Sequence, residues 1–529
     1  MPTLDWLNRD AAFRIAEQVP YRLLEAVSHH GSGDPGNLLV QGDNLQALKA
    51  LLPLYRGQVK CIFIDPPYNT KSAFEHYDDN LEHSQWLSMM LPRLQLLREF
   101  LRDDGSIWVT LDDAEVHYFK VLGDQVFGRA QFILDIAWRK RDGPPNDRKL
   151  GAVHDHLLIW ACRRDSASKK SIAEESFNLM ERTEKADAQY QTYSEPTGPD
   201  ARGPFRKIDT TANGKGGRFV ESLFFAIRNP YTGENVFPRK GTCWRHSRDE
   251  MNRLQADGRL YWGVKGTATT PMRKLFKSEA KAGMSSPSIW DDAGLNQHAS
   301  AEMEKLFGEK AAFETPKPEA LMQRIVHIAT NPGDLVLDSF LGSGTTAAVA
   351  HKMGRRWIGI EMGDHAVTHC LPRLEKVVAG EQGGISAAVN WQGGGGFRFL
   401  RLGEPVFDAE GHIHVGVRFA ALAAFVWQQA TRSAYTAPER GGLPGTVPGT
   451  PLLGVHEGLA VMLLFNGILG DRRPEGGNVL TLAVLQALKA LCTHAGPKVV
   501  YGEACRLGAA RLEAEGITFR QIPYELAAR

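Results

Sequence analysis

Strand-like apolar runs alternate with segments of helical periodicity along much of the chain, and this alternation limits the folds open to it. The first such region contains a strand, a helix, a strand and a helix at 59–64, 81–101, 106–111 and 114–127. The second repeats this order at 335–340, 345–353, 357–361 and 365–378. Because this order is typical of parallel sheets with helices on both faces, we predict an α/β fold with a doubly wound sheet.

A long polar stretch separates the two regions. Two further strand candidates, 133–138 and 156–161, precede it. Within it, residues 201–280 contain 16 Lys and Arg against 7 Asp and Glu, although the whole chain carries a net charge of only +1. The aromatic residues among these charges are Phe219, Phe224, Phe225, Tyr231, Trp244, Tyr261 and Trp262. Basic and aromatic side chains together suit nucleic-acid binding, but a solvated basic face over an ordinary core fits the composition equally well.

These patterns divide the chain into six segments. We expect an N-terminal helical extension, the first half of the sheet domain, an insertion, the second half of the sheet domain, a flexible Gly-rich linker and a small C-terminal α/β domain. Their predicted limits are 1–36, 37–162, 163–300, 301–379, 380–396 and 397–529.

The first candidate site is the tetrapeptide Asp65-Pro66-Pro67-Tyr68, directly after the apolar strand 59–64. Ligands of α/β sheets bind at the carboxyl ends of the strands, and two prolines make the turn there stiff. The Asp65 carboxylate and the Pro66 carbonyl can accept the two hydrogens of an exocyclic amine, and the Tyr68 ring can stack on a flat base. A Pro-rich strand exit with an incidental tyrosine is the simpler alternative.

The second candidate site follows the strand that begins at Leu335. Its turn contains Asp338, Ser339, Phe340, Gly342, Ser343, Gly344, Thr345 and Thr346. The glycines allow close approach of a ligand, and the free N–H groups of the following helix can bind a carboxylate or a pyrophosphate. Glu361 ends the next strand and can accept hydrogen bonds from a ribose, and Asp43 and Asn44 form a polar strand exit that can hold an adenine.

Several functional classes are excluded or disfavoured. Gly214-Lys215 is followed by glycine, so no phosphate-binding loop of the ATPase type is present. The six cysteines form no C-x-x-C pair, so we expect free thiols in a reducing compartment and no metal site. The N-terminus carries no signal-peptide pattern and no apolar run approaches 20 residues, so we expect a cytoplasmic protein without membrane spans.

Taken together, the two sites resemble those of amino-group DNA methyltransferases that use S-adenosylmethionine (SAM). The match is to the circularly permuted beta group, in which the catalytic tetrapeptide precedes the cofactor loop. The runs NLLVQGDNL at 37–45 and IDPPYNT at 64–70 look like the modification (Mod) subunit of type III restriction systems. ETPKPE at 314–319 is similar to the segment that this family places against the methionine end of SAM, and ITFRQIPY at 517–524 looks like the tail of Mod subunits.

The resemblance implies a seven-stranded, Rossmann-like methyltransferase sheet with 163–300 as an inserted target-recognition domain. Asp65 and Asp338 lie 273 positions apart and must then face one pocket, so one sheet must contain both halves. It implies catalytic roles for Asp65, Pro66, Pro67 and Tyr68, with SAM as the cofactor. The implied SAM-binding residues are Asp43, Asn44, Lys317, Pro318, Asp338, Ser339, Phe340, Gly342, Ser343, Gly344, Thr345, Thr346 and Glu361.

The implied reaction is methyl transfer to N6 of an adenine flipped out of double-stranded DNA. Asp in the first position of the tetrapeptide favours adenine, whereas Ser is usual in cytosine-N4 enzymes. The partners that the resemblance implies are DNA, a second copy of the chain and a restriction helicase-nuclease. A cytosine-N4 or RNA methyltransferase, a solitary methyltransferase and a catalytically silent DNA-recognition subunit are the alternatives. A dinucleotide-dependent oxidoreductase is disfavoured because the third glycine of its fingerprint is missing.

Overall fold

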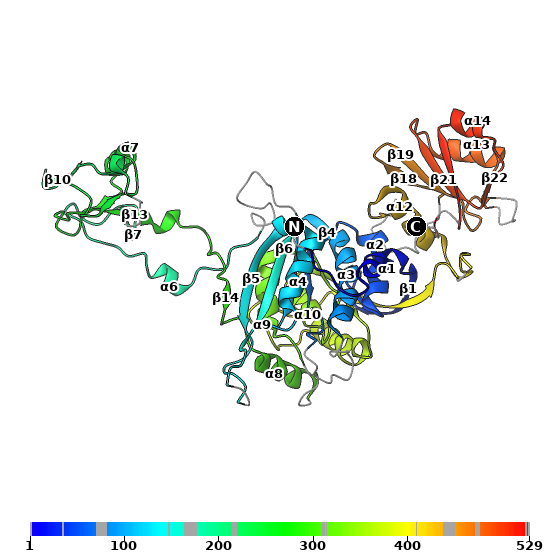
Figure 1. Ribbon diagram of the computed structural model, residues 1–529, viewed down its shortest axis with the longest axis horizontal. Helices are drawn as coiled ribbons and strands as arrows, with labels where there is room; N and C mark the ends of the chain where they lie inside the picture. Colours follow the sequence, from blue (N-terminus) through cyan, green and yellow to red (C-terminus); the bar gives the residue numbers. More distant parts are fainter. Residues whose placement is uncertain are drawn as a thin grey trace. The chain divides into compact units, whose positions relative to one another are not determined.

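The computed structural model describes residues 3–33, 36–69, 82–146, 149–162, 177–213, 219–308, 313, 315–408, 410–436, 450–470, 477–523 and 526. The chain forms two compact units (Figure 1). One contains residues 1–178 and 287–529, and the other contains residues 179–286.

A ten-stranded sheet is the centre of the first unit. In spatial order its strands are β1 (Arg22–Gly31), β17 (Gly396–Pro405), β2 (Leu38–Gln41), β16 (Arg356–Glu361), β15 (Leu335–Asp338), β3 (Val59–Ile64), β4 (Leu101–Leu111), β6 (His154–Ala161), β5 (Phe132–Arg139) and β14 (Ile289–Trp290). From β17 to β4 all neighbours are parallel. Both halves therefore share one sheet, as predicted, and the pair Val336–Cys61 joins them. The expectation of seven strands is wrong, because β1 and β17 extend one edge and β14 extends the other.

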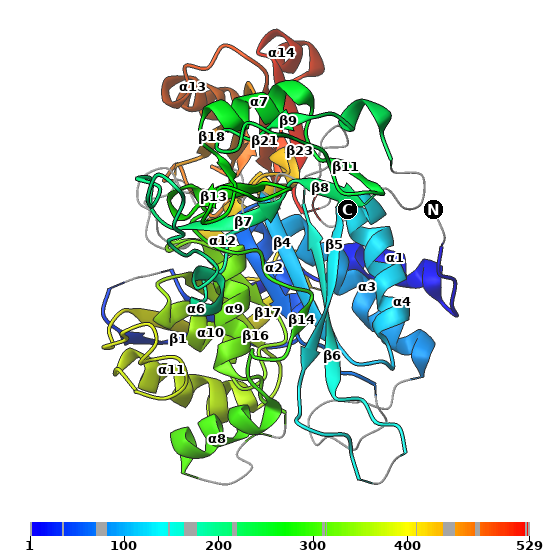
Figure 2. The same ribbon diagram turned by 90° about the vertical axis from the view of Figure 1, so that its left-hand side faces the viewer.

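Helices cover both faces of this sheet (Figure 2). One face packs against helices that share its apolar core, namely α1 (Arg9–Gln18), α2 (Asn44–Tyr55), α3 (His83–Phe100) and α4 (Val116–Gly123). The other carries α9 (Glu319–Ala329), α10 (Thr345–Lys352) and α11 (Leu371–Val378), and α8 (Asn296–Phe307) precedes them in the chain. All six residues of β3 are buried, which explains why central strands such as this one read as continuous apolar runs.

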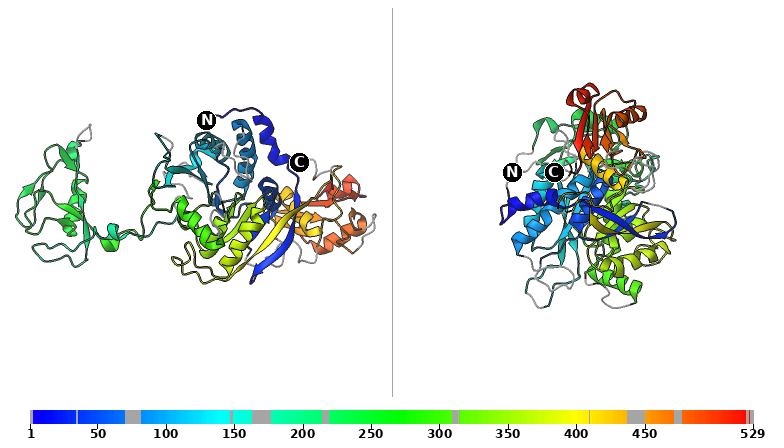
Figure 3. Two further views of the ribbon diagram at one scale, coloured as in Figure 1. Left: turned by 90° about the horizontal axis from the view of Figure 1, so that it is seen from below. Right: turned by 90° about the vertical axis from the view of Figure 1, so that its right-hand side faces the viewer.

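The N-terminal segment differs from the prediction of a helical extension. It contains α1 but continues as the strand β1, which pairs antiparallel with β17 (Figure 3). β17 also pairs parallel with β2, so the predicted boundary at 397 is wrong and this strand belongs to the central sheet. The error arises because β1 and β17 gain their hydrogen bonds from partners more than 350 positions away, which no local pattern reveals.

The segment 380–396 is packed, and the prediction of a flexible linker is wrong. The Gly394 carbonyl lies 2.9 Å from Nε2 of His351, and the Trp391 indole donates to the Val377 carbonyl over 2.8 Å. A Cβ on Gly393 would lie 2.9 Å from backbone atoms of Gly380, and the φ of Gly393 is 92°. The glycines therefore allow close backbone approach at this place.

In its described residues, the second unit contains short strands and two α-helices. They are α6 (Glu184–Asp187), β7 (Phe205–Asp209), β8 (Thr211–Asn213), β9 (Ile227–Arg228), β10 (Asn235–Val236), β11 (Thr242–Trp244), α7 (Arg248–Ala256), β12 (Leu260–Tyr261) and β13 (Met272–Phe276). The unit begins and ends side by side, because Met180 and Met284 form an antiparallel bridge. It is narrower than the predicted insertion 163–300, since β14 and α8 belong to the first unit.

After β17 the chain forms a four-stranded sheet of its own. The elements of this region are α12 (Phe419–Thr431), β18 (Leu452–His456), β19 (Leu459–Leu463), β20 (Val479–Leu480), α13 (Leu482–Leu491), β21 (Lys498–Gly502), β22 (Ala504–Cys505), α14 (Ala509–Ala514) and β23 (Ile517–Gln521). β19, β21 and β23 are parallel, and apolar clusters lie on both faces of this sheet. Among the described residues no helix is long and apolar enough to cross a membrane.

Candidate active site

The two predicted sites meet at one edge of the central sheet. Asp65 follows β3 and Asp338 ends β15, and these strands are parallel neighbours. Glu361 ends β16 on the other side of β15. Parallel strands end at the same edge, so residues from distant parts of the sequence converge there.

The tetrapeptide is held by residues on neighbouring elements. Oδ1 of Asp65 accepts a hydrogen bond from the Thr110 hydroxyl at 2.6 Å, and Oδ2 pairs with the ammonium of Lys317. The Pro67 carbonyl accepts from the indole of the fully buried Trp86 at 2.8 Å. The Asp65 carboxylate thus has a fixed orientation at the end of β3.

The Tyr68 ring lies near two cation–carboxylate pairs. Its hydroxyl donates to Oδ2 of Asp155 at 3.3 Å, and Asp155 is paired with Lys140. The ammonium of Lys317 lies 5.2 Å from the ring centroid and that of Lys140 lies 6.0 Å from it. Burial raises the pKa of Asp155 above its usual range, although Lys140 and Lys317 lower it. Each ammonium group near the ring is therefore paired with a carboxylate, Lys317 with Asp65 and Lys140 with Asp155.

The Gly-rich turn is fixed by the acids that precede and follow it. Oδ1 of Asp338 accepts from the Phe340 amide at 2.9 Å, and Oδ2 accepts from the Thr346 hydroxyl at 2.5 Å. Burial, with Asp65 and Glu361 nearby, raises the pKa of Asp338 to about 7. Oε2 of Glu361 accepts from the Gly342 amide at 2.7 Å, which joins the turn to β16.

The strand exit after β2 is also part of this edge. Asp43 caps α2 by accepting from the Gln46 amide at 3.0 Å, and it pairs with Arg93 at 2.9 Å. The Asn44 amide donates to the Ser339 carbonyl at 2.8 Å. Both residues predicted to hold an adenine are therefore beside the Gly-rich turn, and both also have structural roles.

Lys317 and Pro318 link this turn to the tetrapeptide. Thr345 Oγ1 donates to the Lys317 carbonyl at 3.2 Å, while the Lys317 side chain reaches Asp65. Pro318 is the N-cap residue of α9. The predicted methionine-binding segment thus lies between the two predicted sites.

The residues at this edge fit a nucleoside cofactor with a charged tail. Gly342 and Gly344 have φ angles of 56° and 85°, which side chains other than glycine rarely adopt, so the turn is kept free of Cβ atoms at two places. The buried hydroxyl of Ser339 has no hydrogen-bond partner among the described residues. Glu361 supplies a carboxylate and Lys317 an ammonium, and these groups suit ribose hydroxyls and a carboxylate, respectively.

Comparison with known proteins identifies the family. A family model described as DNA methylase matches residues 59–371, which is more than half of the chain. The chain belongs to this DNA methylase family. A relative from Haemophilus influenzae, named as the HindVI Mod subunit of a type III restriction-modification enzyme, is 31% identical over 429 residues and the match covers 71% of this chain and 55% of that protein.

Other relatives bear names of the same kind. The StyLTI Mod subunit of Salmonella typhimurium is 29% identical over 379 residues, covering 65% of this chain and 55% of that protein. Among solved structures, the cytosine-N4-specific PvuII DNA methyltransferase matches with a TM-score of 0.33 and 16% identity, over 66% of this chain and 92% of that one. The chain spans a little over half of the length of the two Mod relatives.

Several residues of this site were missed by the sequence analysis. Thr110 lies within β4, Lys140 directly follows β5 and Asp155 is near the start of the antiparallel strand β6, whereas the predicted residues lie at the ends of β2, β3, β15 and β16. The buried ions behind the Gly-rich turn were also missed, namely Arg373, Glu319 and Lys352. Arg373 donates to Thr345 Oγ1 at 2.9 Å and pairs with Glu319, which also binds Lys352. The only part of this network that the sequence analysis had pointed to was the ETPKPE run, which contains Glu319.

The aromatic residues of the basic stretch 201–280 are divided between core and surface. Phe225, Trp244, Tyr261 and Trp262 are buried in the second unit, as an ordinary core requires. Phe219 and Phe224 are 47% and 41% exposed, and so is Phe237 at 50%. Their rings form a chain with centroids 6.0 and 5.7 Å apart. Exposed apolar clusters of this kind are typical of interaction surfaces.

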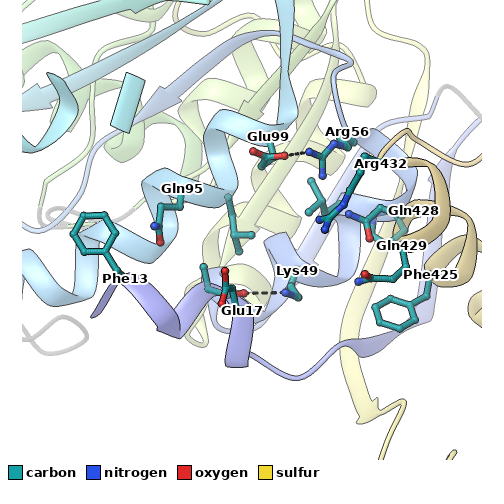
Figure 4. A pocket seen from close by; sticks show the side chains of 14 residues that line it. Phe13, Glu17, Lys49, Arg56, Gln95, Glu99, Phe425, Gln428, Gln429 and Arg432 are labelled. Atoms are coloured by element: carbon teal, nitrogen blue, oxygen red, sulfur yellow. Dashed lines mark hydrogen bonds and ion pairs between the residues drawn. The ribbon is translucent and has the colours of Figure 1, made fainter. Parts of the chain in front are cut away.

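A cavity of about 430 Å³ lies elsewhere in the first unit, between α1, α2, α3 and α12 (Figure 4). Arg56 pairs with Glu99 there, and Lys49 donates to the Ala16 carbonyl at 2.8 Å. None of the predicted site residues lines it. The chemistry expected of the chain is therefore assigned to the strand exits and not to this cavity.

Proposed function

We propose that this chain transfers a methyl group from SAM to the exocyclic N6 of an adenine in double-stranded DNA. The observation that carries the proposal is the placement of Asp65 and Tyr68 beside the turn that contains Gly342 and Gly344, on adjacent parallel strands. An amine acceptor and a cofactor turn are both needed for this reaction, and neither is needed for DNA recognition alone. Membership in the DNA methylase family supports the same reaction.

The chain's own residues would act on a base that has left the duplex. Extrusion costs a few kcal/mol, and stacking on Tyr68 would recover about 1–3 kcal/mol of it. Oδ2 of Asp65 and the Pro66 carbonyl would accept the two amino hydrogens, and Thr110 would hold the other oxygen of Asp65 in place. As positive charge grows on the nitrogen, the Asp65 carboxylate would stabilise it.

SAM would supply an electrophilic methyl group on a sulfonium. Its binding is assigned to the Gly-rich turn and its neighbours. Glu361 would bind the ribose, Asp43 the adenine and Lys317 the methionine end. No metal takes part in this proposal.

The partners are part of the same proposal. The excess of basic residues in 201–280 and the exposed chain of Phe219, Phe224 and Phe237 support DNA as the ligand of the second unit. The names of the relatives as Mod subunits support a role as the modification component of a restriction system, with a separate restriction helicase-nuclease. We also propose a cytoplasmic homodimer, which light scattering after size exclusion would test.

Single-molecule sequencing with modified-base detection tests the function. DNA from cells making the protein is compared with DNA from cells making the Asp65→Ala form. We expect N6-methyladenine at one sequence motif only with the unsubstituted protein. N4-methylcytosine at a motif would identify the cytosine alternative, and no new DNA mark from a protein that binds SAM would overturn the proposal.

A further inference from the structure

The ammonium of Lys317 lies where the target amine has to bind. It contacts Oδ2 of Asp65, the oxygen that Thr110 leaves free, and it lies 5.2 Å from the centre of the Tyr68 ring. A base stacked on Tyr68 would present its amino nitrogen to the same oxygen. Lys317 therefore imitates the amine of the substrate.

From this overlap we infer that Lys317 is a positioning residue that exchanges between two carboxylates, Asp65 and the carboxylate of SAM. Cofactor binding would then draw Lys317 away from Asp65 and open the catalytic oxygen to the target base. This inference rests on the proposed function, because it takes SAM as the cofactor and Asp65 as the amine acceptor. It adds that SAM binds before the target base.

Burial supports the exchange. The Lys317 side chain is 11% exposed and that of Asp65 is 19% exposed, and a charge in such a place needs a partner of opposite sign. The other acid near Tyr68 is Asp155, and its short contact is with Lys140. When the target amine takes Oδ2 of Asp65, Lys317 therefore needs a new anion.

The position of the Lys317 backbone supports the carboxylate of SAM as the new anion. The Lys317 carbonyl accepts from Thr345, the first residue of α10 in the cofactor turn, so the side chain starts beside this turn. The carboxylate of the methionine end is the anionic group of SAM. An ammonium with three N–H donors can contact two carboxylates, but in the exchange that we infer Asp65 and SAM compete for Lys317, and such coupling is reciprocal.

Calorimetric titration with SAM, without DNA, tests the competition in four forms of the full chain. They are the unsubstituted protein, Asp65→Asn, Lys317→Met and the double variant. Asp65→Asn releases Lys317, so we expect SAM to bind about tenfold more tightly. Lys317→Met should weaken SAM binding, and adding Asp65→Asn to it should change nothing further. Methylthioadenosine, which lacks the carboxylate, is the control ligand, and its affinity should be the same with and without Asp65→Asn.

The outcomes separate this inference from the proposed function. Failure of the unsubstituted protein to bind SAM would count against the proposed function itself. Normal SAM binding that Asp65→Asn leaves unchanged or weakens would overturn the exchange alone. Tightening that persists in the Lys317→Met background would also overturn it, because the effect would not pass through Lys317. If Asp65→Asn does not fold, as judged by circular dichroism, Asp65→Ser gives the same comparison.

Discussion

At the scale of single residues, the site combines one aromatic ring with two nearby ammonium groups, each paired with a carboxylate. Tyr68 contacts Asp155 through its hydroxyl and lies near Lys317 through its ring. The hydroxyl and the ring can therefore be tested separately. In the proposed reaction the ring would stack on the target base, while the hydroxyl holds the ring against Asp155 of β6.

Tyr68→Ala should lower kcat/KM for methyl transfer by about 10- to 100-fold, because stacking of one base is worth about 1–3 kcal/mol. Tyr68→Phe keeps the ring and loses a 3.3 Å hydrogen bond, so it should lower kcat/KM less than about fivefold. Transfer of labelled methyl groups to plasmid DNA measures both. Equal losses in the two variants would contradict a stacking role.

Thr110 should matter for turnover and not for cofactor affinity, since it contacts Asp65 at 2.6 Å. Thr110→Val removes a hydrogen bond to a carboxylate, and we expect kcat to fall about tenfold with the dissociation constant of SAM unchanged. Thr110→Ser retains the hydroxyl and is the matched control. A Thr110→Val enzyme with full turnover would show that the orientation of Asp65 does not limit the reaction.

At the scale of elements, the sequence predicted the strands that carry the site but not the edge of the sheet. β3 was predicted to the residue, because a fully buried parallel strand is a continuous apolar run. No residue of β1 is fully buried, and its partner β17 follows a glycine run that resembles a linker. Asp65, Asp338 and Glu361 could be found as strand exits, whereas Thr110 and Asp155 depend on which strands become neighbours, and local sequence does not contain that information.

The packing of 380–396 leads to a stability prediction. Gly393→Ala places a Cβ 2.9 Å from Gly380 at a φ of 92°, so it should lower the free energy of unfolding by about 1–3 kcal/mol. Gly143→Ala is the control, because nothing lies within 4 Å of its added Cβ. Urea denaturation measures both. Equal midpoints for the two variants would indicate a flexible linker after all.

The junction of α8 and α9 leads to a pH prediction. Burial, with Glu319 nearby, raises the pKa of Glu302 from 4.5 to about 7. Between these values the unfolded chain has lost this proton and the folded chain keeps it, so the stability that Glu302 contributes is complete below pH 4.5 and is lost as pH rises through 7. Glu302→Gln should therefore gain stability relative to the unsubstituted protein between pH 5 and 8, by at most about 3 kcal/mol. Urea midpoints at the two pH values measure this gain, and a constant difference would contradict it.

At the scale of the whole molecule, binding of the cofactor and recognition of the target are assigned to different units. The expected SAM residues all lie in the unit of 1–178 and 287–529, and the exposed aromatic chain lies in 179–286. Each unit has its own apolar core. The two activities should therefore be separable.

Replacement of 181–283 by a short Gly-Ser linker should leave the dissociation constant of SAM within about twofold while abolishing DNA methylation. The Met180–Met284 bridge makes this closure sterically simple. Calorimetry and methyl-transfer assays measure the two properties. Methylation at the original motif by the shortened chain would show that the second unit does not select the target.

The Met180–Met284 bridge has a further consequence for how such proteins diversify. A unit whose two ends lie side by side can be replaced by another domain of different size or shape, because the replacement needs only adjacent termini to connect to the same two positions. If the second unit selects the target, as proposed, recombination at these positions would supply new target preferences, and the proposed catalytic residues would be inherited unchanged.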